Sequence, residues 1–265
     1  MTGGWTALER EFDAWAQSDR EALVWWRDDD AAGPSKSLTR LLDLAADCAA
    51  PLSLAVIPAK AEPGLVNLLA NHPADATVLQ HGFAHSNHAA AGAKKCELTS
   101  PSQRPAVTEE LRLGRTRLST LFGARSRPFL VPPWNRLASD LAARLPEIGF
   151  IGLSTYQPRL RATAVPGLVQ VNCHVDIMQW RPERRFLGTA AALDLLIGHL
   201  SAKRRGDADP DEPSGILSHH LVHDDDAWDF LGRLLRRLAR HPAVRLLPAA
   251  AVFTSDPGTK EAAGC

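Results

Sequence analysis

Short apolar runs alternate along this chain with longer segments in which apolar residues recur every three or four positions. This alternation constrains the fold more than any other feature. Short apolar runs are typical of buried strands, and the longer period is typical of helices packed on a core. Strand and helix repeated in this order predict a parallel sheet covered by helices. We therefore expect an α/β protein, a single-domain distorted (β/α) barrel of seven to eight mostly parallel strands.

The same pattern predicts the extents of the elements. The expected strands cover residues 23–26, 52–57, 76–79, 129–131, 150–153, 168–171, 215–217 and 244–247. The expected helices cover residues 7–16, 38–49, 107–121, 138–145, 190–200 and 227–239. Two irregular segments, 89–105 and 203–214, predict surface loops. We divide the chain into an N-terminal helix (1–20), a barrel domain (21–253) and a flexible tail (254–265).

Charge and apolar patterning argue against several classes of protein. Thirty basic residues balance thirty acidic ones, which does not suit a protein that grips nucleic acid. No apolar run approaches the ~18 to 20 residues of a membrane helix. The first residues lack the basic start and apolar core of a secretory signal, and Cys48, Cys96, Cys173 and Cys265 show no CxxC pairing. We expect reduced thiols in a cytoplasmic protein whose partner is neither a nucleic acid nor a membrane.

Polar residues follow several expected strands at their carboxyl ends. They lie in residues 27–30, 81–88, 132–136, 172–176 and 219–220. In a barrel of parallel strands, reacting groups collect at this rim. His81 and His85 stand four residues apart and can meet one metal ion, for which an aspartate of the first segment is a suitable third ligand. The sequence therefore predicts a metal site at the rim.

These segments resemble the motifs of the polysaccharide deacetylases, the metal-dependent N-deacetylases of carbohydrate esterase family 4, over about residues 24–220. In that family the first motif ends in two adjacent aspartates, a general base and a metal ligand. The resemblance places them on Asp29 and Asp30, with Asp28 and Asp29 as the alternative pair. Arg27 stands where the family usually has a hydroxyl residue, and we count it among the substrate-binding candidates.

The second motif of the family is a histidine, a serine or threonine, two residues, and a second histidine. His81 and His85 match it as metal ligands, with Gly82 in place of the hydroxyl residue. Together with Asp30 they imply a site of two histidines and one carboxylate. His88 lies outside the spacing and is either a substrate-binding residue or a surface histidine.

The third motif, an Arg-Pro-Pro segment, resembles residues 131–134 and implies that Pro133, Trp134 and Asn135 line a wall of the site. Val131 holds the place of the usual arginine. Arg136 either substitutes for that arginine or is an ordinary solvated side chain.

The fourth motif resembles residues 176–180, where Asp176 would orient the base and Trp180 would line the wall or pack in the core. The fifth, Leu-x-His, matches residues 217–219 and implies that His219 is the general acid. His220 is the alternative acid and a substrate-binding candidate. Residues 223–226 look like another ligand cluster, but aspartates there more often cap a helix.

The resemblance implies a hydrolase of non-peptide carbon–nitrogen bonds that removes an acetyl or related acyl group from an N-acetylated sugar or a related amide. Zinc is the expected ion, although two imidazoles and a carboxylate also suit Fe²⁺, Co²⁺ or Ni²⁺. The departures at Gly82 and Val131 motivate one alternative, a non-catalytic sugar-binding or regulatory protein on the same fold. Histidine- and aspartate-rich strand ends motivate another, a metal-dependent phosphoesterase.

Overall fold

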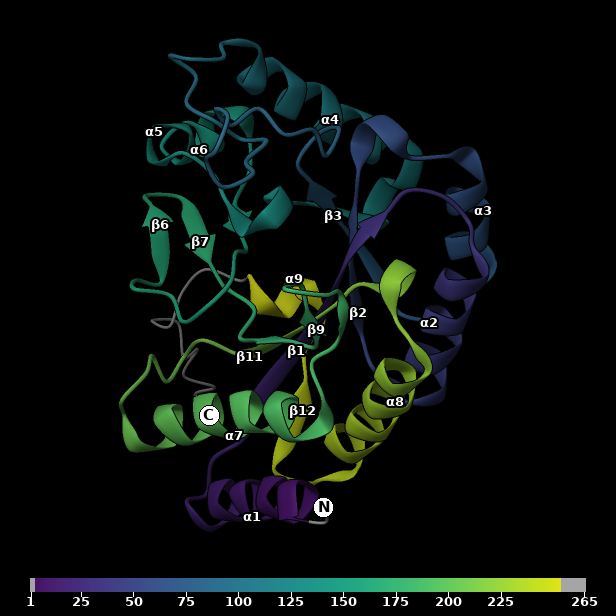
Figure 1. Cartoon of the computed structure of the whole chain (residues 1–265), viewed down its shortest axis with the longest axis vertical. Coiled ribbons are helices and arrows are strands. Elements are labelled where there is room, and N and C mark those ends of the chain that lie inside the picture. Colours follow the sequence, from purple (N-terminus) through teal and green to yellow (C-terminus); the bar gives the residue numbers. More distant parts are fainter. Residues whose placement is uncertain (1–2, 254–265) are drawn as a thin grey trace, which may run out of the picture.

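A mostly parallel sheet of ten strands forms the centre of the computed structural model, which describes residues 3–253 (Figure 1). The strands are β1 (Ala22–Ala31), β2 (Leu52–Val56), β3 (Ala76–His81), β4 (Ser126–Val131), β5 (Gly152–Leu153), β6 (Thr163–Val165), β7 (Leu168–Gln170), β8 (Val175–Asp176), β11 (Ser214–Ser218) and β12 (Val244–Leu246). Their order is β6-β7-β5-β4-β3-β2-β1-β11-β8, and β12 pairs with β1. Every expected apolar run contains a strand, and the α/β class is confirmed.

The two ends of this strand order are parts of one extended segment. The first half of residues 168–176 pairs with β5, since Val171 N donates to Leu153 O at 3.1 Å. The second half pairs with β11, since His174 N donates to Gly215 O at 2.7 Å. This segment therefore links the ends of the sheet, which gives the distorted barrel that the sequence predicted. The antiparallel β6 is an addition at the edge.

Helices surround the sheet (Figure 1). They are α1 (Gly3–Gln17), α2 (Lys36–Asp47), α3 (Pro63–Asn71), α4 (Ala106–Phe122), α5 (Ser139–Ala142), α6 (Leu145–Ile148), α7 (Thr189–Arg205), α8 (Asp225–Arg240) and α9 (Ala249–Val252). The predicted α8 begins as expected because Asp224 caps it, accepting from Ala227 N at 2.8 Å. No helix in residues 3–253 is long and apolar enough to cross a membrane.

Two predicted boundaries were wrong. The expected helix 138–145 is two short helices, since Pro146 at the start of α6 has no N–H to continue the helix from α5. The expected loop 203–214 begins too early, because α7 runs on through a basic last turn that suits the helix dipole and ends at the left-handed Gly206. The helix α3 was missed. The predicted tail, with Cys265, lies outside the described residues.

Alternate residues of the strands face different cores. Trp25, Leu79, Val131 and Leu217 belong to one buried cluster, which we call the inner face. Their neighbours Val24, Trp26, Val78 and Ile216 belong to another cluster under the helices, which we call the outer face. Side chains alternate along a strand, so residues an even number of positions apart share a face. A polar residue further along the strand can therefore be assigned to the inner or the outer face. This alternation sorts the site residues.

Candidate metal and catalytic site

The period of two along β1, β3 and β11 brings selected polar residues to the inner face. Counting on from Trp25, Leu79 and Leu217 puts Asp29, His81 and His219 on that face. Asp28 faces outward beside Ser218, its partner in the parallel register. The pairing of β1 with β2 shifts register after Asp28, and Asp30 has a positive φ of 74°, so it leaves the alternation.

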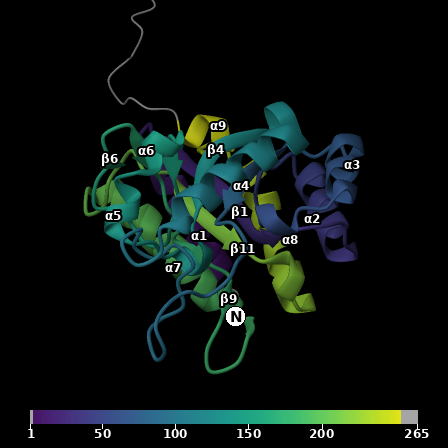
Figure 2. The ribbon, with the colours of Figure 1, turned by 90° about the horizontal axis from the view of Figure 1, so that it is seen from above.

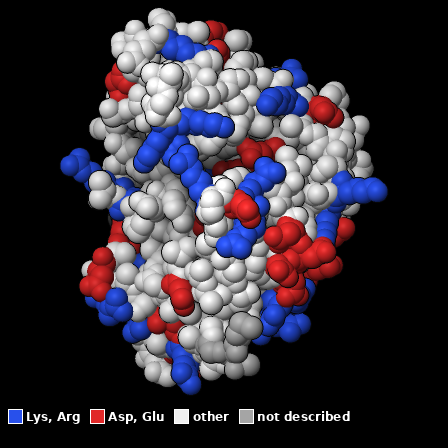
Figure 3. All heavy atoms as spheres, viewed as in Figure 1, with Lys and Arg blue, Asp and Glu red and all other residues white. Residues whose placement is uncertain are grey.

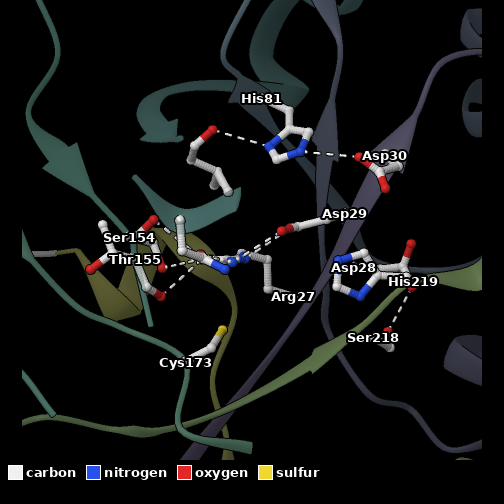
Figure 4. Close-up of polar contacts among 12 residues, drawn as sticks. Arg27, Asp28, Asp29, Asp30, His81, Ser154, Thr155, Cys173, Ser218 and His219 are labelled. Carbon is white, nitrogen blue, oxygen red and sulfur yellow. Dashed lines mark hydrogen bonds and ion pairs between the residues drawn. The ribbon is translucent and has the colours of Figure 1, made fainter. Parts of the chain in front are cut away.

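Asp30, His81 and His85 converge on one point. Oδ1 of Asp30 lies 3.2 Å from Nε2 of His81 and 3.2 Å from Nε2 of His85. The three ligand-capable atoms lie within 4.8 Å of one another. Figure 4 shows Asp30 and His81 facing each other. One carboxylate and two imidazoles in this arrangement can hold a divalent ion with coordination positions left open.

The hydrogen bonding of His81 suits a metal ligand. Its Nδ1 lies 3.0 Å from the carbonyl oxygen of Val131, so this nitrogen carries a proton and Nε2 is the nitrogen available to an ion. Burial lowers the pKa of His85, with nearby His81 adding to the effect, which favours the neutral ring that binds metals. The residues present therefore fit a divalent ion.

The electrostatics of the cluster favour a positive charge. Burial alone would lower the pKa of His81, but Asp29 and Asp30 outweigh it and raise that pKa. Burial would raise the pKa of Asp30, but the hydrogen bond and charge of His81 hold it well below its usual range. A site that stabilises positive charge on its own ligands is also one that stabilises a bound cation.

Strained backbone gathers at the same place. Residues 3–253 contain seven non-glycine residues with positive φ, and four of them are Asp30, His85, Trp134 and Asn135. Such conformations cost free energy and persist where the surrounding structure enforces them, commonly at functional sites. The ring of Trp134 packs 4.5 Å from that of His85. Trp134, one of the predicted wall residues, therefore lies against His85.

Arg27 holds Asp29 from the floor of the site. Its guanidinium is buried and contacts both carboxylate oxygens of Asp29, at 2.9 and 3.0 Å. It also donates to Asn135 Oδ1 at 2.7 Å. A further hydrogen bond runs from Arg27 to Ser154 Oγ at 2.6 Å (Figure 4). Burial would lower the pKa of Arg27, but Asp29 outweighs it and raises that pKa. With no exposed surface, Arg27 has no face for a substrate, contrary to our expectation for it.

Val131 is buried on the inner face and leaves the base candidate without the usual arginine of the third motif. Arg136 does not replace it, because Arg136 is exposed and donates to the carbonyl oxygen of Lys95 at 3.0 Å. Arg27 supplies the guanidinium instead, from β1. The sequence contained this arginine two residues before Asp29, a separation that puts both side chains on one face of a strand.

His219 stands beside the predicted fourth motif. Its Nδ1 lies 4.0 Å from Oδ1 of Asp176, and its ring packs edge-on against Trp180 at 4.6 Å. The Trp180 indole donates to Asp176 Oδ2 at 2.7 Å. Burial raises the pKa of Asp176 although His219 opposes the shift. These contacts place an imidazole, a carboxylate and an indole together at the inner rim.

Asp28 and His220 form a separate buried pair on the outer face. Asp28 accepts from the His220 ring, from His220 N at 3.0 Å and from Ser218 Oγ at 2.6 Å. Burial would lower the pKa of His220, but Asp28 raises it. His220 is 1% exposed, which leaves it no face for a substrate. Behind it, Nε2 of His223 accepts from His219 N at 3.3 Å.

The structure does not gather His88 with the other candidates. His88 is exposed, and its backbone N–H donates to Cys96 O at 2.8 Å. Sequence reasoning in turn missed Glu97, which is fully buried and accepts hydrogen bonds from the loop that carries His85. A glycine at position 82, in place of a hydroxyl residue, was the only signal that something else supports this loop.

A second group, His174, His199 and Glu212, also has ligand atoms within 4.8 Å of one another. Gly215 N donates to Nδ1 of His174 at 2.9 Å, so the ring proton is on Nε2, 3.3 Å from Glu212 Oε2. Burial lowers the pKa of His174 and keeps the ring neutral. Its Nε2 therefore has no lone pair for a metal. We interpret this group as a hydrogen-bonded pair in the core, beside the stacked His199 ring.

The side chains of Asp30 and His85 are 30% and 22% exposed, so the cluster reaches the surface. Figure 3 shows acidic atoms near the middle of the face that it draws, with lysine and arginine side chains beside them. In Figure 2 the loop after β3 and the hairpin of β9 (Met178–Gln179) and β10 (Arg185–Phe186) project from the same side. Asn135, Arg136, Thr155 and Gln170 are among the residues that line a groove of about 700 Å³. The groove shares Asn135 with the predicted wall of the site, while Asp30, His81 and His85 do not line it.

No protein-family model and no curated protein matches this chain. Solved structures do match its fold. A presumed polysaccharide deacetylase from Mycobacterium smegmatis matches with a TM-score of 0.62 at 16% identity, over 88% of this chain and 89% of the other. The Bc1960 peptidoglycan N-acetylglucosamine deacetylase gives a TM-score of 0.55 at 15% identity, over 91% and 95%.

Peptidoglycan deacetylase PdaC from Bacillus subtilis gives a TM-score of 0.54 at 11% identity, over 88% of this chain and 90% of the other. These matches span nearly the whole described chain, and they agree with the resemblance found in the motifs. The chain therefore has the polysaccharide deacetylase fold, in a form whose sequence has diverged far from these neighbours.

Proposed function

We propose that this chain is a metal-dependent hydrolase that removes an acetyl or related acyl group from an N-acetylated sugar or a related amide. The observation that carries the proposal is the convergence of Asp30, His81 and His85 at 3.2 Å, with the Nδ1 proton of His81 fixed by Val131. Of the two metal-like groups in residues 3–253, only this one has histidine tautomers that suit a metal.

Asp30, His81 and His85 would hold the ion. Zinc suits two imidazoles and a carboxylate, and Fe²⁺, Co²⁺ and Ni²⁺ suit them as well. When bound, such an ion supplies Lewis acidity, which polarises an acyl carbonyl and lowers the pKa of water from 15.7 towards ~7. Activity should therefore follow metal content, whichever of these ions the protein carries.

Asp29 would act as the proton acceptor. Its two oxygens are already oriented by Arg27, so the carboxylate is held in one position when a water molecule loses its proton to it. Asn135 and Ser154 in turn hold Arg27. This chain of contacts orients Asp29 without an arginine from the third motif.

His219 would give a proton to the departing amine. Asp176 lies 4.0 Å from its Nδ1 and would orient the ring, while Trp180 packs against it. A backbone N–H of the Trp134 turn would stabilise the negative charge that develops on the acyl carbonyl oxygen when water attacks. The products would be acetate and a free amine.

The substrate would be a small N-acetylated sugar conjugate or an oligosaccharide. The groove beside Asn135 offers about 700 Å³ and hydroxyl- and amide-bearing side chains such as Thr155 and Gln170. Two of the structural neighbours described above are peptidoglycan deacetylases, which supports an amino-sugar substrate. Trp134 and Trp180 would present apolar ring faces to a sugar.

The experiment is a parallel assay of acetate and phosphate release by protein loaded with Zn²⁺ or Co²⁺. The panel contains N-acetylated amino sugars, their oligomers, simple N-acetyl amides and phosphate esters, and His219→Ala is the matched variant. Acetate release that His219→Ala abolishes supports the proposal. Metal retention without any turnover would favour the non-catalytic binding protein, and phosphate release would favour the phosphoesterase.

A further inference from the structure

The carboxylate of Glu97 is the acceptor for three backbone N–H groups in the loop after β3. Phe83 N donates to Oε2 at 3.1 Å, and Ala84 N and Ser86 N donate to Oε1 at 2.7 and 3.2 Å. The last two donors flank His85, whose φ of 57° is unusual for a histidine. Three hydrogen bonds to one carboxylate restrict the backbone on both sides of His85, so Glu97 can enforce this conformation.

Glu97 fills the space that the missing hydroxyl side chain would need. Gly82 has a φ of 54°, and a Cβ built on it would collide with the Glu97 carboxylate and lie 2.6 Å from Cδ of Pro133. A serine or threonine at position 82 could therefore not coexist with Glu97 in this conformation. Gly82 and Glu97 are a complementary pair, and the departure from the family motif has a structural reason.

Glu97 is itself fixed to the wall of the site. The next residue, Leu98, is buried, forms a parallel bridge with Leu137 and accepts from Ala138 N at 2.8 Å. Leu137 follows the turn that carries Trp134 and Asn135. Glu97 thus connects the loop of His85 to the segment that shapes the wall.

We propose that Glu97 is a positioning residue that holds His85 in metal-binding geometry, in place of the hydroxyl side chain of the family's second motif. Glu97 acts through the loop and does not contact the ion. The proposal rests on the metal role of His85 in the proposed function.

The test compares Glu97→Ala and Glu97→Gln with wild type, and uses Glu109→Ala, an exposed glutamate paired with Arg112 on α4, as the control. The readouts are the affinity for Co²⁺ and the visible absorption spectrum of the Co²⁺ protein, which reports ligand geometry. Residues that support a metal ligand typically contribute 10- to 100-fold to affinity. We expect Glu97→Ala to weaken Co²⁺ binding by about 10- to 100-fold and to change the spectrum.

Glu97→Gln should bind Co²⁺ more weakly than wild type but more tightly than Glu97→Ala, because the glutamine amide keeps one acceptor oxygen. Thermal unfolding of the metal-free proteins identifies a variant that has lost its fold. If Glu97→Ala is unfolded, Glu97→Gln is compared with wild type instead. A folded Glu97 variant with wild-type Co²⁺ affinity and spectrum would overturn the proposal.

Failure of the proposed function has a different signature. If wild type binds no Co²⁺, the metal site fails, and hydrogen exchange at the amides of Ala84 and Ser86 then tests the loop alone. Faster exchange in Glu97→Gln than in Glu109→Ala would retain Glu97 as the residue that fixes the loop. Equal exchange would remove that role as well.

Discussion

Arg27 and Asp29 form a buried two-point ion pair within a single strand: Nε of Arg27 lies 2.9 Å from Oδ1 of Asp29, and Nη2 lies 3.0 Å from Oδ2. Residues two apart on a strand share a face, so β1 supplies both the carboxylate and its cation. Removing one partner of a buried pair leaves the other charge unsatisfied. The proposed base therefore depends on a residue that no substrate can reach.

Arg27→Lys tests this dependence. A lysine keeps the charge but cannot contact both oxygens of Asp29. We expect kcat to fall by about 100-fold, within the ~10² to 10⁴ that acid–base groups contribute, while bound metal is unchanged. Arg136→Lys, at an exposed position, is the control and should leave kcat unchanged. If steady-state kinetics instead gave a lower kcat for Arg136→Lys and an unchanged kcat for Arg27→Lys, Arg136 would be the residue that supports the base.

His219→Gln should impair catalysis, whereas His220→Gln should impair folding stability. His219→Gln removes the proposed acid and should lower kcat by roughly 10² to 10⁴, with little effect on stability. His220→Gln leaves Asp28 without its ring partner and should lower the free energy of unfolding by about 3 to 5 kcal/mol, with activity per folded molecule largely retained. Kinetics together with urea unfolding separate the two, and a catalytic defect confined to His220→Gln would exchange their roles.

Stability should depend on pH through His223. Burial lowers the pKa of His223 to about 4 from its ordinary 6.5, although Asp28 opposes the shift. Between these values the unfolded state binds more protons, so this contribution is present above pH 6.5 and is lost as pH falls through 4. At about 1.4 kcal/mol per pKa unit, the loss is at most about 3.5 kcal/mol.

Urea unfolding of wild type and His223→Gln at pH 4 to 7 measures this contribution. Wild type should lose more stability than the variant as pH falls, since glutamine offers the His219 backbone N–H an acceptor that does not titrate in this range. Identical pH profiles would mean that His223 titrates normally.

Trp180→Phe should impair catalysis by a smaller amount. Phenylalanine keeps a ring against His219 but loses the N–H that donates to Asp176 at 2.7 Å. Loss of that hydrogen bond, worth about 1.5 kcal/mol or more to a charged acceptor, should lower kcat by about 10-fold. Trp180→Leu loses both contacts and should be worse. Equal kcat for Trp180→Phe and wild type would leave Trp180 a packing role only.

The sequence predicted the strands because buried apolar runs mark them directly, and it predicted the rim because polar residues follow those runs. The pattern alone could not choose between the pairs Asp29–Asp30 and Asp28–Asp29, since three identical residues carry no information about which face each one takes. Only the family resemblance favoured the first pair. The structure supplies that information through the register of β1 with β11, which puts Asp28 beside Ser218. The roles of the aspartates remain a proposal.

The supports of the site were harder to predict. Glu97 accepts hydrogen bonds from the backbone of the loop that carries His85. Both lie in an irregular segment, where no periodicity indicates which residues will be in contact. The contact of Arg27 with Asn135 spans 108 positions and depends on how β1 and the third motif lie across the barrel. Such contacts follow from tertiary packing and not from local pattern.

Bound metal in Asp30→Ala and Asp28→Ala, measured beside wild type by elemental analysis after loading with Zn²⁺, tests the central claim most directly. The account predicts one ion per wild-type chain and per folded Asp28→Ala chain, and none in Asp30→Ala, with acetate release lost on chelation and restored by Zn²⁺. Full metal occupancy in Asp30→Ala would contradict the account.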